Sequence, residues 1–153
     1  MPRPKTIEEW KAQSPGMDLG LAQAAWKQAL KLGGGDKKKS MNYYQLLLET
    51  AMQESKLGKM DGANPMQLTQ GTIQDFRNRY SKEFGEMVDA EPTPLEKQMG
   101  MAALIYRKRM NKNYDISTLE GRAKLWKDKY NTSAGEGTPE KYIKNNAQWK
   151  WGE

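Results

Sequence analysis

Neither cysteine nor histidine occurs among the 153 residues of this sequence. Without cysteine, disulfide bonds are excluded and the redox compartment cannot be judged from them. The absence of both residues also removes the usual zinc sites and the nucleophile–histidine arrangements of many hydrolases. Carboxylate chemistry remains, and we expect neither a metal ion nor a cofactor.

Long apolar runs are absent as well. No stretch approaches the roughly 18 consecutive apolar residues that a membrane-spanning helix needs, so we expect no insertion into a membrane. The first residues, MPRPKTIEEWKAQSPG, contain no apolar core of a secretory signal peptide. We therefore expect synthesis in the cytoplasm without a recognisable export signal.

The chain carries a net charge of +6, which favours an anionic partner. Two short basic runs, Lys37–Lys39 and Arg107–Arg109, are typical of solvated surface. Neither alternates with aromatic residues as a platform for single-stranded nucleic acid would. We therefore expect no nucleic-acid partner, and the bacterial cell wall, whose peptidoglycan carries free carboxylates, is another anionic candidate.

The length suits one globular domain, and five Trp, seven Tyr and ten Met supply bulky groups for its core. Hydrophobic periodicity predicts helices and no convincing strand, so the predicted fold class is all-α, with a small β-hairpin near residues 59–68. We interpret residues 1–36 as an N-terminal arm and bracing helix, and residues 37–153 as the main domain of a single monomeric unit.

Start signals and apolar stripes define the predicted helices. A helix over about 18–32 is expected to bury Leu19, Ala22, Trp26 and Leu30, and residues 33–39 to form a linker. Further helices are expected over about 40–55, 72–85, 94–110, 117–130 and from 138 onward. Their start signals pair Thr72 with Asp75, Thr93 with Glu96, Ser117 with Glu120 and Thr138 with Glu140.

The helix predicted over 40–55 places one carboxylate at the edge of the core. Its inward stripe at helical spacing consists of Tyr43, Leu47, Ala51 and Glu54. Glu49 falls on a separate polar stripe, together with Gln45 and Gln53, and is expected to face water. A carboxylate at the core edge is costly unless it is hydrogen-bonded, protonated or used, so Glu54 is the candidate functional acid.

Short segments in the order of a known enzyme family follow from Glu54 onward. Glu54-Ser55, a turn and then Met66-Gln67 resemble the Glu-Ser … Gly-Leu-Met-Gln signature of the lysozyme-like lytic transglycosylases. Tyr130-Asn131 and the residues up to 142 resemble that family's Ala-Tyr-Asn-Ala-Gly … Tyr segment, and residues 99–106 resemble the helix between them. The similarity spans residues 42–145 and points to the superfamily of soluble lytic transglycosylases and goose-type lysozymes.

This resemblance implies a lysozyme-like fold and cleavage of the β-1,4 bond between N-acetylmuramic acid and N-acetylglucosamine. Glu54 would act as the single catalytic acid and base, and the product would carry a 1,6-anhydro ring. Contacts to the substrate would come from Ser55, Gln67, Thr69, Tyr130 and Asn131. Partners other than peptidoglycan strands are not implied.

Two alternatives stay open. Asp61 could serve as a second carboxylate beside Glu54, as in lysozymes that hydrolyse with water, although Asp61-Gly62 is also a common turn pair. The chain could instead be a glycan-binding or structural virion protein without turnover. A cell-wall substrate without an export signal favours a bacteriophage endolysin or virion-associated enzyme, or delivery by a secretion system.

Overall fold

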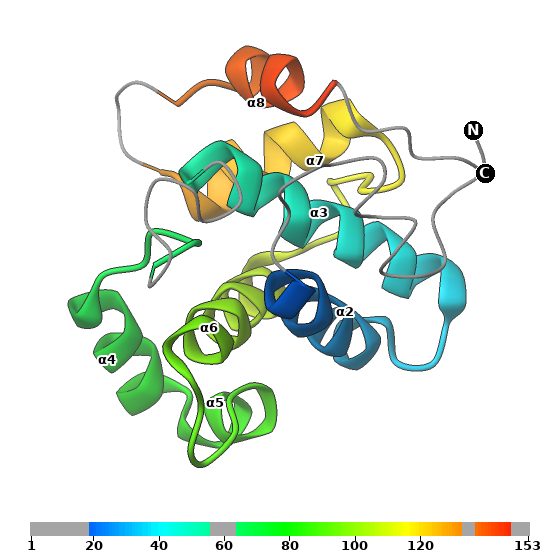
Figure 1. The fold of residues 1–153 in the computed structure, drawn as a ribbon. Helices are drawn as coiled ribbons and strands as arrows, with labels where there is room; N and C mark the ends of the chain where they lie inside the picture. Colours follow the sequence, from blue (N-terminus) through cyan, green and yellow to red (C-terminus); the bar gives the residue numbers. More distant parts are fainter. Residues whose placement is uncertain (1–18, 56–63, 133–136, 148–153) are drawn as a thin grey trace.

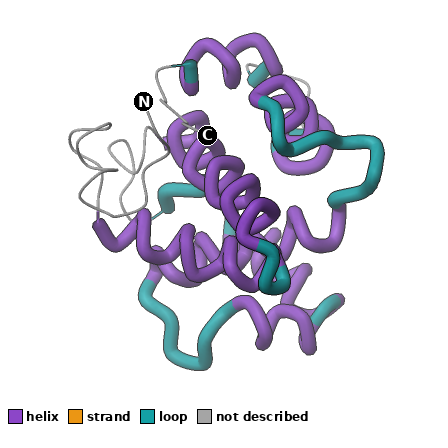
Figure 2. The backbone as a smooth tube through the Cα atoms, turned by 90° about the vertical axis from the view of Figure 1, so that its right-hand side faces the viewer, coloured by secondary structure: helices purple, strands orange, loops and turns teal. Residues whose placement is uncertain are grey.

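The computed structural model describes residues 19–55, 64–132 and 137–147. In order, the helical segments are α2 (Leu19–Gly33), α3 (Lys37–Ser55), α4 (Gln70–Arg79), α5 (Ser81–Met87), α6 (Pro94–Arg109), α7 (Leu119–Leu125), the π-helical turn η1 (Trp126–Tyr130) and α8 (Pro139–Asn146) (Figure 1). These described residues contain no strand (Figure 2), which confirms the all-α prediction for them. The predicted hairpin falls partly outside the described residues, and its remainder, 64–68, is a loop. No helix in the described ranges is long and apolar enough to cross a membrane.

Helix α6 runs through the centre of the molecule. Every residue from 98 to 106 is buried, because α2, α3, α5 and η1 all pack against it. Its start is the predicted one: the Thr93 hydroxyl accepts from the Glu96 amide at 3.1 Å, and Glu96 accepts from the Thr93 amide at 3.0 Å. Gly100 permits the close approach of α5, since a Cβ there would lie 2.7 Å from the carbonyl oxygen of Met87.

Helices α2 and α3 form a tightly packed pair. Gly34 and Gly35 adopt positive φ angles of 57° and 92°, which lets two residues reverse the chain. The prediction of a linker through residue 39 was wrong, because Lys37–Lys39 form the first turn of α3 and the Asp36 carboxylate caps it by accepting from the amides of Lys38 and Lys39.

The predicted inward stripe of α2 was also wrong in part. Trp26 and Leu30 are 37% and 48% exposed, whereas Ala25 and Ala29 are fully buried. The small alanine side chains allow α2 to approach α3 and α6 closely, so the helix turns this face, with Leu21 and Ala22, toward the core. The bulkier Trp26 remains at the rim, where its ring meets the edge of Tyr44 at a centroid distance of 5.1 Å.

Two of the other helix starts differ from the prediction by one to three residues. Helix α4 is capped by Thr69 rather than Thr72, and α7 by Thr118 rather than Ser117. In both cases a neighbouring hydroxyl competes for the capping position, and sequence alone does not rank the two. The Thr138 cap of α8 is confirmed, since its hydroxyl accepts from the Lys141 amide at 3.2 Å.

The expectation that Glu49 faces water was wrong. Glu49 is fully buried, and the Arg122 guanidinium binds both of its carboxylate oxygens, at 2.6 and 3.0 Å. The hydroxyl of Tyr142 donates to Glu49 at 2.9 Å, and Asn146 donates to its backbone carbonyl at 3.3 Å. Helices α7 and α8 therefore cover the side of α3 that the sequence pattern assigned to solvent (Figure 1), and Gln45 is buried there too.

Candidate functional site

Glu54 lies in the last turn of α3 with its side chain partly buried. Its Oε1 atom accepts a hydrogen bond from the indole Nε1 of Trp126 at 3.2 Å and one from the amide Nδ2 of Asn131 at 3.4 Å. Burial raises the pKa of Glu54 above its ordinary value, and these two hydrogen bonds lower it by less than burial raises it. A carboxyl group in this setting holds a proton more readily than a solvated one does.

The two donors to Glu54 share one acceptor atom. Within the described part of the chain, Oε1 receives both hydrogen bonds and Oε2 receives none, and no Lys or Arg forms an ion pair with either oxygen. The proton of a neutral Glu54 therefore belongs on Oε2, because Oε1 is already occupied as an acceptor. Oε2 is the atom that can give a proton to, or take one from, a bound molecule.

The turn η1 positions both donors. The backbone N–H of Asn131 donates to the backbone carbonyl of Trp126 at 2.8 Å. This bond spans five residues rather than four, so the end of the helix is wider than an α-helical turn. Such π-helical turns are frequent at functional sites. The ring of Trp126 is fully buried and lies 5.3 Å from that of Tyr142, and a Cβ on Gly137 would come within 2.6 Å of it. Close packing therefore fixes the indole in the direction of Glu54.

The loop over residues 64–69 is held beside Glu54 by three side chains. The Ser55 hydroxyl donates to the Pro65 carbonyl at 2.6 Å, and the Tyr130 hydroxyl donates to the Met66 carbonyl at 2.7 Å. From α6, the Gln98 amide donates to the Leu68 carbonyl at 3.1 Å and accepts from the Leu68 amide at 3.2 Å. The loop is thus attached to α3, η1 and α6 together.

Gln67 and Thr69 take part in the local structure of this loop. Gln67 is the only non-glycine residue with positive φ, 54°, in the described ranges, and its side-chain amide donates to the Asn64 carbonyl at 2.8 Å. That backbone conformation is strained for a residue with a side chain, and such strain is concentrated at functional sites. Thr69 caps α4. Neither residue donates to Glu54.

A pair of stacked aromatic rings packs next to the loop. The rings of Tyr106 and Tyr130 stack at a centroid distance of 5.2 Å with an angle of 20° between their planes. Tyr106 is fully buried and shares a hydrogen bond of 2.8 Å with Thr50 of α3. Burial, followed by the nearby Tyr106 and Glu54, raises the pKa of Tyr130 well above its ordinary value, so Tyr130 acts as a neutral phenol.

The structure brings most of the predicted site residues together. Glu54, Ser55, Tyr130 and Asn131 meet around one loop, although Ser55 is fully buried and holds that loop rather than offering surface to a ligand. Asp61 lies outside the described residues. The sequence analysis did not identify Trp126 or Gln98 as members of this site. For Trp126 the available signal was that a buried indole N–H needs a hydrogen-bond acceptor.

No group of three potential metal-binding side chains occurs in the part of the chain that the structure describes. Comparisons of the chain with protein-family models, curated proteins and solved structures find no match.

Proposed function

We propose that this protein cleaves peptidoglycan as a lytic transglycosylase with a lysozyme-like fold, and that Glu54 is its catalytic acid and base. The observation that carries the proposal is the state of Glu54: partly buried, with a raised pKa, and held through one oxygen by two neutral donors. A general acid must be protonated near neutral pH and must have a free oxygen that reaches the substrate. Burial shifts the pKa of Glu54 upward, in the direction that favours the protonated acid, and its Oε2 accepts no hydrogen bond from the described residues.

The reaction follows from these properties. Oε2 of Glu54 donates its proton to the glycosidic oxygen between N-acetylmuramic acid and N-acetylglucosamine, and the bond from the muramoyl C1 to that oxygen breaks. The substrate's own acetamido group stabilises the positive charge on C1. Ionised Glu54 then takes the proton from the muramoyl C6 hydroxyl, whose oxygen bonds to C1 and closes the 1,6-anhydro ring. Glu54 ends protonated, and no water is consumed.

Neighbouring residues support each step. Trp126 and Asn131 stabilise the carboxylate that exists between the two proton transfers, because both donate to Oε1. Neither of them occupies Oε2, which carries the proton. Gln67, exposed on the loop, carries a side-chain amide of the kind that binds an acetamido group. A net charge of +6 assists capture of the anionic wall.

The test compares Glu54→Gln with a matched control on purified sacculi. Glu54→Gln keeps the acceptor for Trp126 and removes the transferable proton, so we expect normal folding and a loss of activity on the order of 100-fold or more. Glu49 is unsuitable as the control, because it is buried in an ion pair. Glu91→Gln removes an equal charge from an exposed loop and should stay active. Full activity of Glu54→Gln would leave only a binding role.

Mass spectrometry of the released fragments separates the two catalytic mechanisms. Ring closure yields 1,6-anhydro-muramic acid, whereas hydrolysis adds one water of about 18 Da. We expect anhydro products, and we expect Asp61→Asn to retain a substantial fraction of wild-type activity. Hydrated products together with an inactive Asp61→Asn would show that Glu54 works with a second carboxylate.

A further inference from the structure

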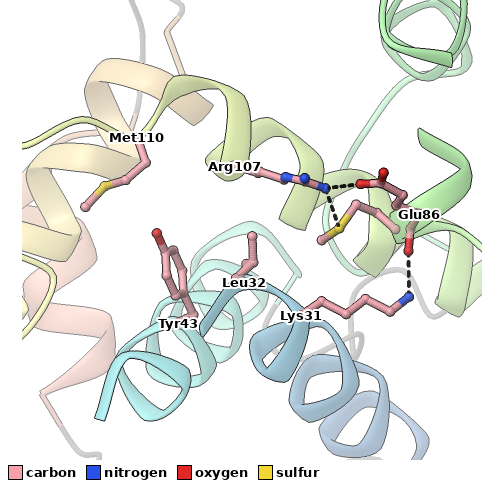
Figure 3. Close-up of a pocket in the computed structure, with 7 residues that line it drawn as sticks. Lys31, Leu32, Tyr43, Glu86, Arg107 and Met110 are labelled. Carbon is pink, nitrogen blue, oxygen red and sulfur yellow. Dashed lines mark hydrogen bonds and ion pairs between the residues drawn. The ribbon is translucent and has the colours of Figure 1, made fainter. Parts of the chain in front are cut away.

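A pocket of about 700 Å³ opens between α2, α3, α5 and α6, away from Glu54. It is lined by Lys31, Leu32, Tyr43, Glu86, Met87, Arg107 and Met110 (Figure 3). Tyr43 lies eleven residues before Glu54 on α3, which separates the two by roughly 16 Å along the helix axis. The volume of the pocket is within the range of about 300–1,000 Å³ that is usual for binding sites of small molecules.

Charged groups gather at one end of this pocket (Figure 3). Arg107 donates to the Glu86 carboxylate at 2.7 Å, and Lys31 donates to the Glu86 backbone carbonyl at 2.9 Å. The Lys31 ammonium is thus bonded to a neutral oxygen, and the nearby Asp89 carboxylate is bonded to Lys27 at 2.6 Å. Burial lowers the pKa of Lys31, and Asp89 offsets this only in part. This end of the pocket holds two cations and one anion.

The other end is apolar and carries one phenol. Leu32, Tyr43 and Met110 are half-buried there, so part of each faces the pocket rather than the core. The Tyr43 hydroxyl has no hydrogen-bond partner among the described residues, and burial raises the pKa of Tyr43. The apolar part of a ligand bound here would displace water from these side chains and would contact the ring of Tyr43.

We propose that this pocket binds a small amphiphilic acid, with its carboxylate or phosphate between Lys31 and Arg107 and its apolar body against Leu32, Tyr43 and Met110. The Glu86 carboxylate occupies part of the anion position and competes with the ligand for Arg107. Both partners of that ion pair are nearly half exposed, at 42% and 44%, and such pairs contribute little to stability. A ligand acid can therefore displace Glu86 at small cost.

Octanoate is the probe for the full-length chain, measured by isothermal titration and by NMR of methionine methyl groups. We expect a dissociation constant of about 1 mM or tighter, with shifts confined to the methyls of Met87 and Met110. Acetate lacks the alkyl chain and octan-1-ol lacks the charge, so each should bind at least about tenfold more weakly than octanoate does. Absence of octanoate binding, or shifts spread over the other methionines, overturns the proposal.

Variants of the charged residues give effects of opposite sign. Lys31→Gln and Arg107→Gln should each weaken octanoate binding by about tenfold, because each removes one partner of the carboxylate. Glu86→Gln should tighten it several-fold, because it frees Arg107. Lys112→Gln, which removes an equal charge from an exposed residue outside the pocket, should leave it unchanged. Weaker binding by Glu86→Gln, or equal weakening by Lys112→Gln, contradicts the assigned geometry.

Two further experiments test whether the ligand is a free acid or a membrane lipid, and whether the pocket is independent of the Glu54 site. Vesicles containing an anionic phospholipid should not bind more tightly than octanoate does; binding to vesicles alone, lost in Arg107→Gln, would overturn the proposal in favour of a membrane contact. Glu54→Gln should bind octanoate as the wild type does, since none of the pocket residues belongs to the Glu54 site. A loss of binding in that variant would show that the two sites are one.

Discussion

The buried ion pair between Glu49 and Arg122 makes a sharp prediction about stability. The Arg122 side chain is 3% exposed and donates three hydrogen bonds, two to the Glu49 carboxylate at 2.6 and 3.0 Å and one to the Ile116 carbonyl at 3.0 Å. Arg122→Met keeps most of the aliphatic volume and removes all three donors. The hydroxyl of Tyr142 would still donate to the buried Glu49 carboxylate.

We expect Arg122→Met to lower the free energy of unfolding by about 3–5 kcal/mol, because it removes the guanidinium that pairs with a buried carboxylate. A typical domain has only about 5–15 kcal/mol in total, so the variant should be near its limit of stability. Urea denaturation followed by circular dichroism measures this free energy directly. An unchanged slope of the unfolding free energy against urea concentration would show that the folded and unfolded states keep their compactness.

The double variant Arg122→Met/Glu49→Leu should be more stable than Arg122→Met alone, since both charges leave the core together. Arg79→Met is the matched control, because Arg79 is 64% exposed and pairs with Asp75 only at 3.5 Å; its effect should stay within about 0.5 kcal/mol. A loss below about 1 kcal/mol in Arg122→Met would mean that Glu49 is solvated, as its sequence position suggested.

Three other outcomes are expected. Trp126→Phe removes a hydrogen bond that lowers the pKa of Glu54, so the protonated form should persist to higher pH and the alkaline limb of the activity profile should move upward; a downward shift would contradict this. Gln98→Ala should cost about 2–3 kcal/mol in a denaturation experiment, because it leaves the Leu68 amide and carbonyl without their partners, whereas Gln74→Ala on the exposed face of α4 should be nearly neutral. Clearance of sacculi should slow as salt rises, since screening weakens long-range attraction; a salt-independent rate would separate the +6 charge from substrate capture.

The local signals of the sequence predicted α6 and α8 well. The Thr93–Glu96 capping box and the Thr138 cap are realised because the groups involved are three residues apart and need no other part of the chain. Leu47 and Ala51 are buried as predicted, because the apolar stripe of α3 finds the core. These features depend on short-range geometry, and they could be predicted for that reason.

The positions that could not be predicted depend on distant segments. Trp26 is at the rim because alanines on the opposite face of α2 pack more closely, which no count of hydrophobic residues reveals. Glu49 is buried because Arg122, 73 residues later in the chain, supplies its counter-charge. A polar stripe predicts an exposed face only when no later segment covers that face with complementary groups. Here α7 and α8 cover it.

The two carboxylates of α3 differ in the groups that surround them. Glu49 and Glu54 are on one helix, five residues apart, and both are removed from water to a large extent. Glu49 faces a guanidinium, which binds both of its carboxylate oxygens. Among the described residues, Glu54 accepts hydrogen bonds from an indole N–H and a side-chain amide, both neutral and both on one oxygen, and burial raises its pKa. A raised pKa and neutral partners favour proton transfer, and for this reason we propose Glu54 rather than Glu49 as the acid.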